Sequence, residues 1–229
     1  MPTVPKEKRI LLVRHEESRK TLTGAFGDIE CDMITERGRS RSDRIAKSIT
    51  SFAKEIGEPF ELFYAKSARA MQTAERIAKM SGWKKTPLEI RSINLGRIEG
   101  LSAQDVEKKF PEFSRTLGLY RAGLFNSYDL PFPHNAESPM DFERRTFSTF
   151  KRAVKNATQR NLIFVLHRSP MTAMLISIAR ASGHYPEKFY GIVPMQPGDT
   201  FLVTATNTSF GIHAANIPPS KLLSSLRVF

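Results

Sequence analysis

The 229-residue sequence contains a single cysteine, Cys31, so it cannot form an internal disulfide. A protein without disulfides is compatible with a reducing compartment, where disulfides are rare. The sequence also lacks an apolar run of about eighteen residues, the length that a membrane-spanning helix needs. Residues 1–9 are polar and charged and lack the apolar stretch of a secretory signal. We therefore expect a cytoplasmic protein without a membrane partner.

Acidic residues are outnumbered by basic ones, 23 against 35, which gives a formal net charge of +12. Such a surplus attracts nucleic acids, acidic membrane surfaces, nucleotides or phosphorylated metabolites. Nucleic-acid binding would require basic residues gathered on one face with exposed aromatics between them. Here they are scattered, with modest concentrations in residues 37–44 and 144–160 that have the pattern of solvated helix faces. We interpret the charge as a surface that attracts small anions and regard a nucleic-acid partner as unlikely.

Apolar runs and amphipathic segments alternate along the chain, without internal repeats. This alternation predicts an α/β fold, a three-layer sandwich with a mostly parallel central sheet and helices on both faces. We expect one domain over residues 1–229, with a small helical cap inserted at about 100–136, and a loose tail beyond 217. The predicted strands are residues 9–14, 61–64, 161–166, 200–204 and 210–214, and the predicted helices are residues 36–56, 68–80, 139–156 and 170–182.

Two of the predicted strands end in a histidine beside an arginine: Arg14 and His15 follow one, and His167 and Arg168 follow the other. Ligands of open parallel sheets bind at the carboxyl ends of the strands, so the two histidines can converge on one crevice. We expect Ser169 to cap the next helix, which places His167 beside a helix N-terminus that favours an anion. A histidine after a strand is also a common hydrogen-bonding turn residue. From spacing alone, a phosphate site and a purely structural role remain open.

Several short motifs, in order over residues 9–180, resemble those of the histidine phosphatase (phosphoglycerate mutase-like) superfamily, branch 1. Residues 14–18, Arg-His-Glu-Glu-Ser, resemble the signature Arg-His-Gly-Glu-Thr. Residues 32–38 resemble the segment Asp-x-Pro-Leu-Thr-x-x-Gly, and residues 67–74 resemble the helix start that carries a second phosphate-binding arginine, here Arg69. Residues 94–101 and 136–138 resemble the Gly-x-x-Glu/Asp-Gly-Leu turn and the Gly-Glu-Ser segment, and His167 matches the second histidine.

The resemblance implies a metal-independent phosphatase without a cofactor, acting on a small phosphorylated metabolite. His15 would be the nucleophile that takes the phosphoryl group, and Arg14, Arg69 and His167 would hold its oxygens. Two guanidiniums suit this task because their forked donors match phosphate oxygens. Ser18, Arg168 and Ser169 are further candidate ligands of the phosphate or the substrate. A mutase is the less favoured activity, and a homodimer is left open.

Two of the chain's departures from the family involve an acidic residue, one gained and one lost. Glu16 replaces the glycine after the nucleophile, where a carboxylate repels substrate unless it points away or is protonated. Ser92 stands where the family has its general acid, and Arg168 stands where the other branch has an aspartate. Loss of a general acid typically slows a reaction by about 10²–10⁴-fold.

Three explanations of the missing acid compete. Another carboxylate supplies the proton; or the substrate has a leaving group that needs little protonation, such as a phosphohistidine or an anhydride; or the chain is a catalytically weakened, phosphate-binding or regulatory homologue. Glu99 is the first candidate acid, although beside Gly100 it would equally well fix a turn. The other candidate acids are Glu16, Glu17 and Glu137.

The expected cap offers both cations and apolar residues. Single cations there are more often solvated than bound to substrate, and the apolar residues are expected to form the cap's own small core rather than a substrate platform. The cations are Arg97, Lys108, Lys109, Arg115 and Arg121, and the apolar residues are Phe110, Phe113, Leu117, Leu119 and Tyr120.

Overall fold

The computed structural model describes residues 7–27, 32–121, 130–133, 135–182, 193, 195–206 and 208–229; Cys31 lies outside them. Its strands form one sheet in the order β3-β2-β4-β1-β5-β6. Neighbours from β3 to β1 are parallel, whereas β5 runs antiparallel to β1 and β6 antiparallel to β5. The mostly parallel α/β sheet expected from the sequence is thus confirmed. The strands are β1 (Lys8–Arg14), β2 (Phe60–Ala65), β3 (Lys85–Leu88), β4 (Asn161–Leu166), β5 (Thr200–Ala205) and β6 (Phe210–Ile217).

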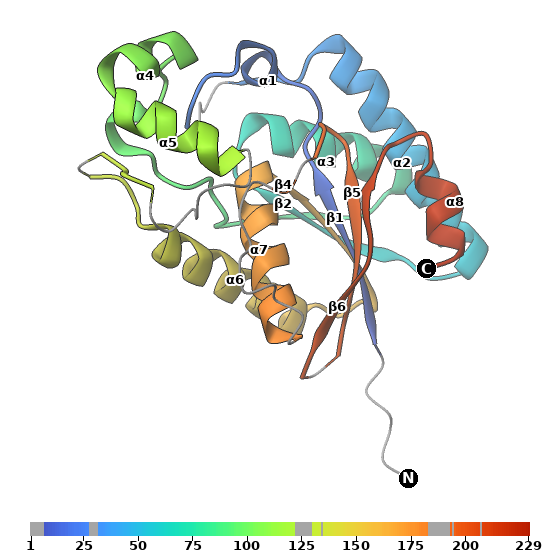
Figure 1. The fold of residues 1–229 in the computed structure, drawn as a ribbon. Coiled ribbons are helices and arrows are strands. Elements are labelled where there is room, and N and C mark those ends of the chain that lie inside the picture. Colours follow the sequence, from blue (N-terminus) through green and yellow to red (C-terminus); the bar gives the residue numbers. More distant parts are fainter. Residues whose placement is uncertain are drawn as a thin grey trace.

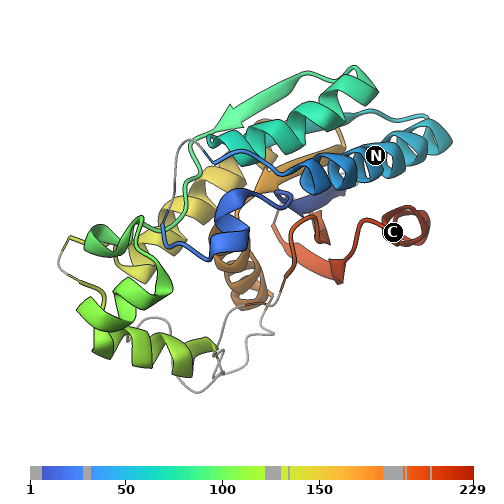
Figure 2. The same ribbon diagram turned by 90° about the horizontal axis from the view of Figure 1, so that it is seen from above.

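Helices cover both faces of this sheet (Figures 1 and 2). One face carries α2 (Glu36–Ile56) and α3 (Ala68–Ser81), and the other carries α6 (Pro139–Asn156) and α7 (Arg168–Ala181). Each amphipathic helix buries its apolar stripe in the main core, which also contains the four central residues of β1 and all of β4 after Asn161. No helix in the described part of the chain is long and apolar enough to cross a membrane.

Local capping explains where several helices begin. Ser138 accepts a hydrogen bond from the backbone of Asp141 at 3.1 Å, and Pro139 occupies the first helical position of α6. Proline is favoured there because its missing N–H would have no partner inside the helix. Thr35 caps α2 in the same way through Gly38. These starts agree with those read from the sequence.

A second, smaller core lies beyond the carboxyl ends of the parallel strands, under the helices α4 (Ala103–Lys109) and α5 (Pro111–Arg121) (Figure 1). Phe113 and Leu117 are buried in it, and Phe110 packs against it. Leu119 instead is 40% exposed, and the side chain of Tyr120 lies outside the described residues. Both helices fall within the expected cap insertion, and they position apolar side chains over the end of the sheet where a ligand would bind.

The chain beyond 217 is not a loose tail. Residues 222–227 form α8 (Leu222–Arg227), which packs on α2 (Figure 1). Leu222 and Leu226 lie one helical turn apart and are fully buried, and Arg227 donates two hydrogen bonds to Glu55. The expectation of a loose tail was wrong because two leucines in a short polar segment are enough to anchor one turn of helix to a neighbour.

Three further elements differ from the reading of the sequence. The helix α7 begins at Arg168 and its N-cap is His167, whereas Ser169 was expected to cap it. The segment between β1 and α2, where no helix was predicted, contains the short helix α1 (Arg19–Thr23). The edge strand β3 was not expected, because a four-residue strand containing Pro87 carries almost no alternating pattern. A short 3-10 turn, η1 (Gly96–Ile98), precedes the cap.

Candidate active site

The two histidines lie next to each other because their strands are paired in register. Arg14 at the end of β1 is opposite Leu166 at the end of β4, and the backbone N–H of His15 donates to the Leu166 carbonyl at 2.8 Å. The rings of His15 and His167 meet edge to face with their centroids 5.1 Å apart. The strand ends therefore converge on one crevice, as the sequence predicted.

Hydrogen bonds select one tautomer of His15. Its Nδ1 lies 2.8 Å from the carbonyl oxygen of Glu16, which can only accept, so Nδ1 carries the proton. Its Nε2 lies 3.2 Å from Nε of Arg69, which can only donate, so Nε2 holds a lone pair. The ring is thus a neutral imidazole with its nucleophilic nitrogen turned toward a cation.

Arg69 is held in the first turn of α3 by a buried carboxylate. Its side chain is 2% exposed, and Nη1 lies 3.7 Å from Oδ2 of Asp32. The same oxygen of Asp32 accepts a hydrogen bond from Oγ of Ser18 at 2.5 Å. Ser18 also caps α1 and is fully buried, and it does not line the cavity. Its position does not support direct binding of phosphate; it instead orients the carboxylate that orients Arg69.

Arg14 comes from the end of β1 and is anchored to the turn before β5. Its Nη1 donates to the carbonyl of Met195 at 2.6 Å, whereas Nε has no hydrogen-bond partner among the described residues. Burial, and then the nearby positive charge of Arg168, lowers the pKa of Arg14 to about 10. The guanidinium therefore still carries its charge at neutral pH, and an anion in the crevice would relieve its repulsion with Arg168.

Burial lowers the pKa of both histidines well below the ordinary value of 6.5. For His15 the next causes are competition with protonation of the adjacent His167 and the positive charge of Arg69; for His167 they are the positive charges of Arg69 and Lys20. Both rings are therefore neutral at physiological pH. A neutral His15 can attack phosphorus, while the surrounding cations attract the phosphate that carries it.

The N-terminus of α7 forms the other side of the crevice. His167 is its N-cap without a side-chain capping bond, and Arg168 and Ser169 follow in the first turn and line the same cavity. Backbone N–H groups in the first turn of a helix point out of it and favour an anion. Arg168 and Ser169 thus lie where the sequence predicted ligands, on the wall opposite α3.

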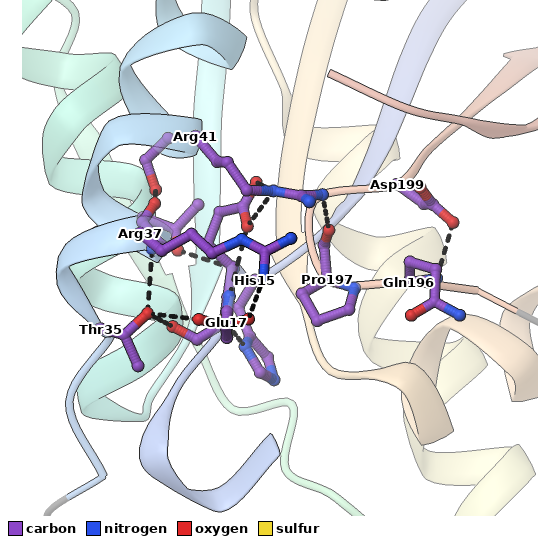
Figure 3. Close-up of polar contacts among 12 residues, drawn as sticks. His15, Glu17, Thr35, Arg37, Arg41, Gln196, Pro197 and Asp199 are labelled. Atoms are coloured by element: carbon purple, nitrogen blue, oxygen red, sulfur yellow. Dashed lines mark hydrogen bonds and ion pairs between the residues drawn. The ribbon is translucent and has the colours of Figure 1, made fainter. Parts of the chain in front are cut away.

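Glu16, the main departure in the signature, points away from the crevice. Its buried carboxylate lies 3.0 Å from Nε of Arg41 on α2, and Nη2 of Arg41 also donates to the carbonyl of Pro197 at 2.6 Å. Figure 3 shows Arg41 reaching from α2 to Pro197. Burial raises the pKa of Glu16, and Arg41 opposes this rise.

The space for this carboxylate comes from Gly198, which has a φ of +82° and where a Cβ would lie 2.0 Å from Oε1 of Glu16. The predicted repulsion of substrate is thereby avoided.

The next residue, Glu17, also turns outward. Its carboxylate accepts from the hydroxyl of Thr35 at 2.8 Å and lies 3.7 Å from Nη1 of Arg37 (Figure 3). Its carbonyl approaches α2 so closely that a Cβ on Gly38 would lie 2.4 Å from it. This contact explains why the motif at 32–38 ends in glycine.

A cavity of about 700 Å³ opens from this crevice toward the cap. Arg14, His15, Arg69 and His167 line one end, together with Ser92 at the position of the family's general acid. The structure thus brings together the four residues that the resemblance assigned to phosphate.

The candidate acids lie elsewhere. Glu99 is exposed and accepts a hydrogen bond from the backbone N–H of Leu95 at 3.1 Å, so it fixes the turn that includes η1. Glu137 forms an ion pair with Arg145, and neither it, Glu99, Glu16 nor Glu17 lines the cavity. The position of Glu99 does not support its assignment as a catalytic acid.

Lys20, Thr172 and Glu143 are among the residues that line the cavity and that reasoning from the sequence missed. The hydroxyl of Thr172 is buried without a hydrogen-bond partner among the described residues. Glu143 is the one carboxylate among the described lining residues, and its Oε1 accepts from Ser177 and Arg180. Thr172 lies one helical turn after Arg168, and this spacing in the sequence could have placed it on the same face of the helix as Arg168.

Among the described cap cations, Arg97, Lys108, Lys109 and Arg115 do not line the cavity, and the side chain of Arg121 lies outside the described residues.

Histidines among arginines at the carboxyl edge of a mostly parallel α/β sheet form a crevice whose charge suits an anion. Residues 10–216 match the histidine phosphatase superfamily (branch 1), and the chain belongs to this superfamily. Within the described residues, no group of three or more histidine, cysteine, aspartate or glutamate side chains is placed to hold a metal ion.

The chain is similar to both phosphatases and mutases. It is 24% identical over 180 residues to a 2,3-bisphosphoglycerate-dependent phosphoglycerate mutase of Bartonella henselae, covering 75% of this chain and 82% of the relative. Its fold is similar to that of the mycobacterial glucosyl-3-phosphoglycerate phosphatase, with a TM-score of 0.74, 16% identity and coverage of 92% and 99% of the two chains. It is also similar to that of phosphoglycerate mutase from Bacillus anthracis, with a TM-score of 0.73, 15% identity and coverage of 99% and 100%.

Proposed function

We propose that this chain is a metal-independent phosphatase that hydrolyses a small phosphorylated metabolite through a phosphohistidine at His15. The observation that carries the proposal is the state of the His15 ring. The Glu16 carbonyl fixes the proton on Nδ1, and the unprotonated Nε2 lies 3.2 Å from the Arg69 guanidinium. A nucleophile held unprotonated beside a fixed cation is suited to receive a phosphoryl group.

The reaction has two transfers. In the first, the Nε2 lone pair of His15 forms a bond to phosphorus, the bond to the ester oxygen breaks, and the oxygen departs with the electron pair and takes a proton from solvent water. In the second, a water molecule attacks the phosphohistidine and gives up a proton to solvent, the nitrogen–phosphorus bond breaks, and Nε2 regains its lone pair. Arg14 and Arg69 stabilise the charge on the phosphoryl oxygens in both steps, because their guanidiniums flank the nucleophile from β1 and α3.

Hydrolysis is favoured over mutase activity by the distribution of cations. A mutase must hold a second phosphate on the same intermediate. The described cations that line the cavity are Arg14, Lys20, Arg69 and Arg168; Arg14 and Arg168 adjoin the two histidines in the chain, and Arg69 lies 3.2 Å from His15. This grouping supports a site for one phosphate.

A phosphatase for an activated phosphate, such as a phosphohistidine or an anhydride, is the second candidate, and a catalytically weakened phosphate-binding or regulatory homologue is the third. Ser92 favours the second candidate, because a serine lines the cavity at the position of the general acid. An activated leaving group departs without a proton, so such a substrate would not need the missing carboxylate.

The test is phosphate release from an aryl phosphate and from a panel of phosphorylated metabolites, measured beside His15→Ala. The wild type is expected to release phosphate from the aryl ester, and His15→Ala is expected to release none. Equal activity of the two proteins would overturn the assignment of His15. Phosphate binding without turnover of any compound would favour the weakened homologue.

A further inference from the structure

The cavity above the phosphate site is far larger than a phosphate group. Its volume of about 700 Å³ is in the range of pockets that enclose whole drug-sized ligands, roughly 300–1,000 Å³. The histidines and their cations occupy one end of it. Most of the space is therefore available to the organic group that carries the phosphate. The side chains that line this space indicate the chemistry of that group.

Both the cap and α7 contribute apolar side chains to the lining of this space. From the loop after α1 and from the cap, Phe26 and Phe113 pack edge to face with centroids 6.4 Å apart, and Phe113 lies 5.4 Å from Phe132. Leu117 of α5 lies on the same side, and Ile176 of α7 lines the cavity from another layer of the fold. Phe113 and Leu117 belong to the cap's small core, Phe26 and Phe132 pack against it, and all four also line the cavity. Apolar surface in contact with water is unfavourable, so a ligand that displaces water from these side chains is stabilised.

Among the described residues that line this part of the cavity, the charged group is Glu143, which forms an ion pair with Arg180. The described lining cations interact with the histidines or with Arg14, and the one described lining carboxylate, Glu143, already accepts hydrogen bonds from Ser177 and Arg180. The remaining polar group of interest is the buried hydroxyl of Thr172, which can accept or donate one hydrogen bond near the phosphate end. A substrate with a second phosphate, a carboxylate or a sugar ring would leave its polar groups against phenylalanine and leucine.

We propose that the substrate is a monophosphate ester of an apolar alcohol, with an aryl or alkyl group that fills the space between the cap and α7. The proposal rests on the proposed function for the identity of the bond that is broken, but it concerns affinity and is tested without turnover. The phosphate sets the position of the ester at the histidines. The aromatic and aliphatic side chains then select the organic group by the apolar area that it removes from water.

The test is the affinity of methyl, butyl and hexyl phosphonate, which carry the same anionic head and cannot be hydrolysed, measured by calorimetry below their aggregation concentrations. Burial of each methylene is worth about two- to fourfold in affinity. We expect hexyl phosphonate to bind at least about thirtyfold more tightly than methyl phosphonate. Hexyltrimethylammonium, with the same chain and a cationic head, should not bind.

Matched variants locate the effect. Leu117→Asn lies in the cavity and Leu119→Asn lies two residues further on α5 on its exposed side, so they change the same helix by the same chemistry. Ile176→Asn changes the lining that comes from α7 rather than from the cap. The ratio of hexyl to methyl affinity should fall about tenfold in Leu117→Asn and in Ile176→Asn and stay at the wild-type value in Leu119→Asn. Because the readout is a ratio between two ligands of one protein, a loss of folded protein does not imitate it.

The outcomes separate this inference from the proposed function. Equal affinity for all three phosphonates would overturn an apolar substrate, even if the protein hydrolyses phenyl phosphate. A steep rise with chain length would support it, even if no ester is hydrolysed. Equal binding of hexyltrimethylammonium would also overturn it, since the chain would then bind without the phosphate site.

Discussion

At the scale of single residues, the reactivity of His15 depends on the groups that surround its ring. Its tautomer comes from the Glu16 carbonyl and the Arg69 guanidinium. Its low pKa comes from burial and from the cations that would bind phosphate. Charges that favour the substrate therefore also keep the nucleophile unprotonated, so one set of residues serves both binding and activation.

The lowered pKa values of His15 and His167 give a pH prediction. In the unfolded chain both rings take up a proton near pH 6.5, whereas in the folded protein they stay neutral to lower pH. Stability should therefore decrease as the pH falls below about 6.5, because the unfolded state then binds more protons. The nucleophile should remain competent over the same range.

Long-range proton–nitrogen NMR spectra of the free protein test this directly, with His15→Ala used to assign the signal. At pH 6.5 the His15 ring should show a protonated Nδ1 and an unprotonated Nε2, with a titration midpoint below 6.5. A midpoint at or above 6.5, or the opposite tautomer, would contradict this explanation of its reactivity.

The serine at position 92 predicts a strong dependence on the leaving group. Without a proton donor, negative charge builds up on the departing oxygen, so the rate should fall steeply as the pKa of the leaving group rises from about 7 to about 14. Ser92→Glu should raise turnover of an alkyl phosphate by about a hundredfold or more. It should change turnover of a nitrophenyl phosphate little.

Ser92→Gln is the matched control, since it has the size of glutamate without an acidic proton, and it should not raise the rate. A flat series in the wild type would show that another acid acts. Glu143→Gln and Glu99→Gln would then identify it, because only the variant of the true acid would make the series steep.

At the scale of elements, the crevice is formed by two in-register strand ends and the first turns of two helices. The strands β1 and β4 supply the histidines, α3 supplies Arg69, and α7 supplies Arg168 and Ser169. The long helix α2 contributes no ligand but supports this arrangement through Arg41, which connects Glu16 to the turn before β5. That turn also anchors Arg14 through Met195. The helix α2 therefore indirectly positions both Arg14 and Glu16.

Arg41→Met tests this support. It would leave the Glu16 carboxylate buried without its cation, which typically destabilises a protein by about 3–5 kcal/mol when the pair is buried. Because the Arg41 side chain is 23% exposed, we expect a loss near the lower end of that range, about 3 kcal/mol, in urea unfolding.

The double variant Glu16→Gln with Arg41→Met should recover most of this loss. Arg37→Met is the matched control on the same helix: its side chain is 71% exposed beside Glu17 and should change stability by less than about 1 kcal/mol. Equal effects of the two single variants would show that Glu16 and Arg41 are not a structural pair.

At the scale of the whole molecule, the parts predicted best from the sequence are those with strong local patterns. Uniformly apolar strands and regular amphipathic helices gave the sheet, its layers and the bounds of α2 and α6. Once parallel strands are expected, residues at their carboxyl ends are expected to meet, which placed His15 beside His167.

What the sequence did not predict depends on distant partners. The outward turn of Glu16 requires Arg41 and the open space at Gly198, which come from other elements. The helix α8 depends on contact with α2 more than on its own short pattern. Ser18 and Glu99 looked like site residues because of their motifs, but the structure pairs them with Asp32 and with the Leu95 backbone.

The most direct test of the central claim is to trap the phosphoenzyme. The wild type, mixed with an aryl phosphate and quenched in base within the first turnover, should carry one phosphate on the peptide that contains His15. The label should be stable in base and lost in acid, as expected of a phosphorus–nitrogen bond. It should be absent in His15→Ala and present in His213→Ala, a histidine on β6 away from the cavity. A phosphate on any other residue, or steady turnover by His15→Ala, would contradict the account.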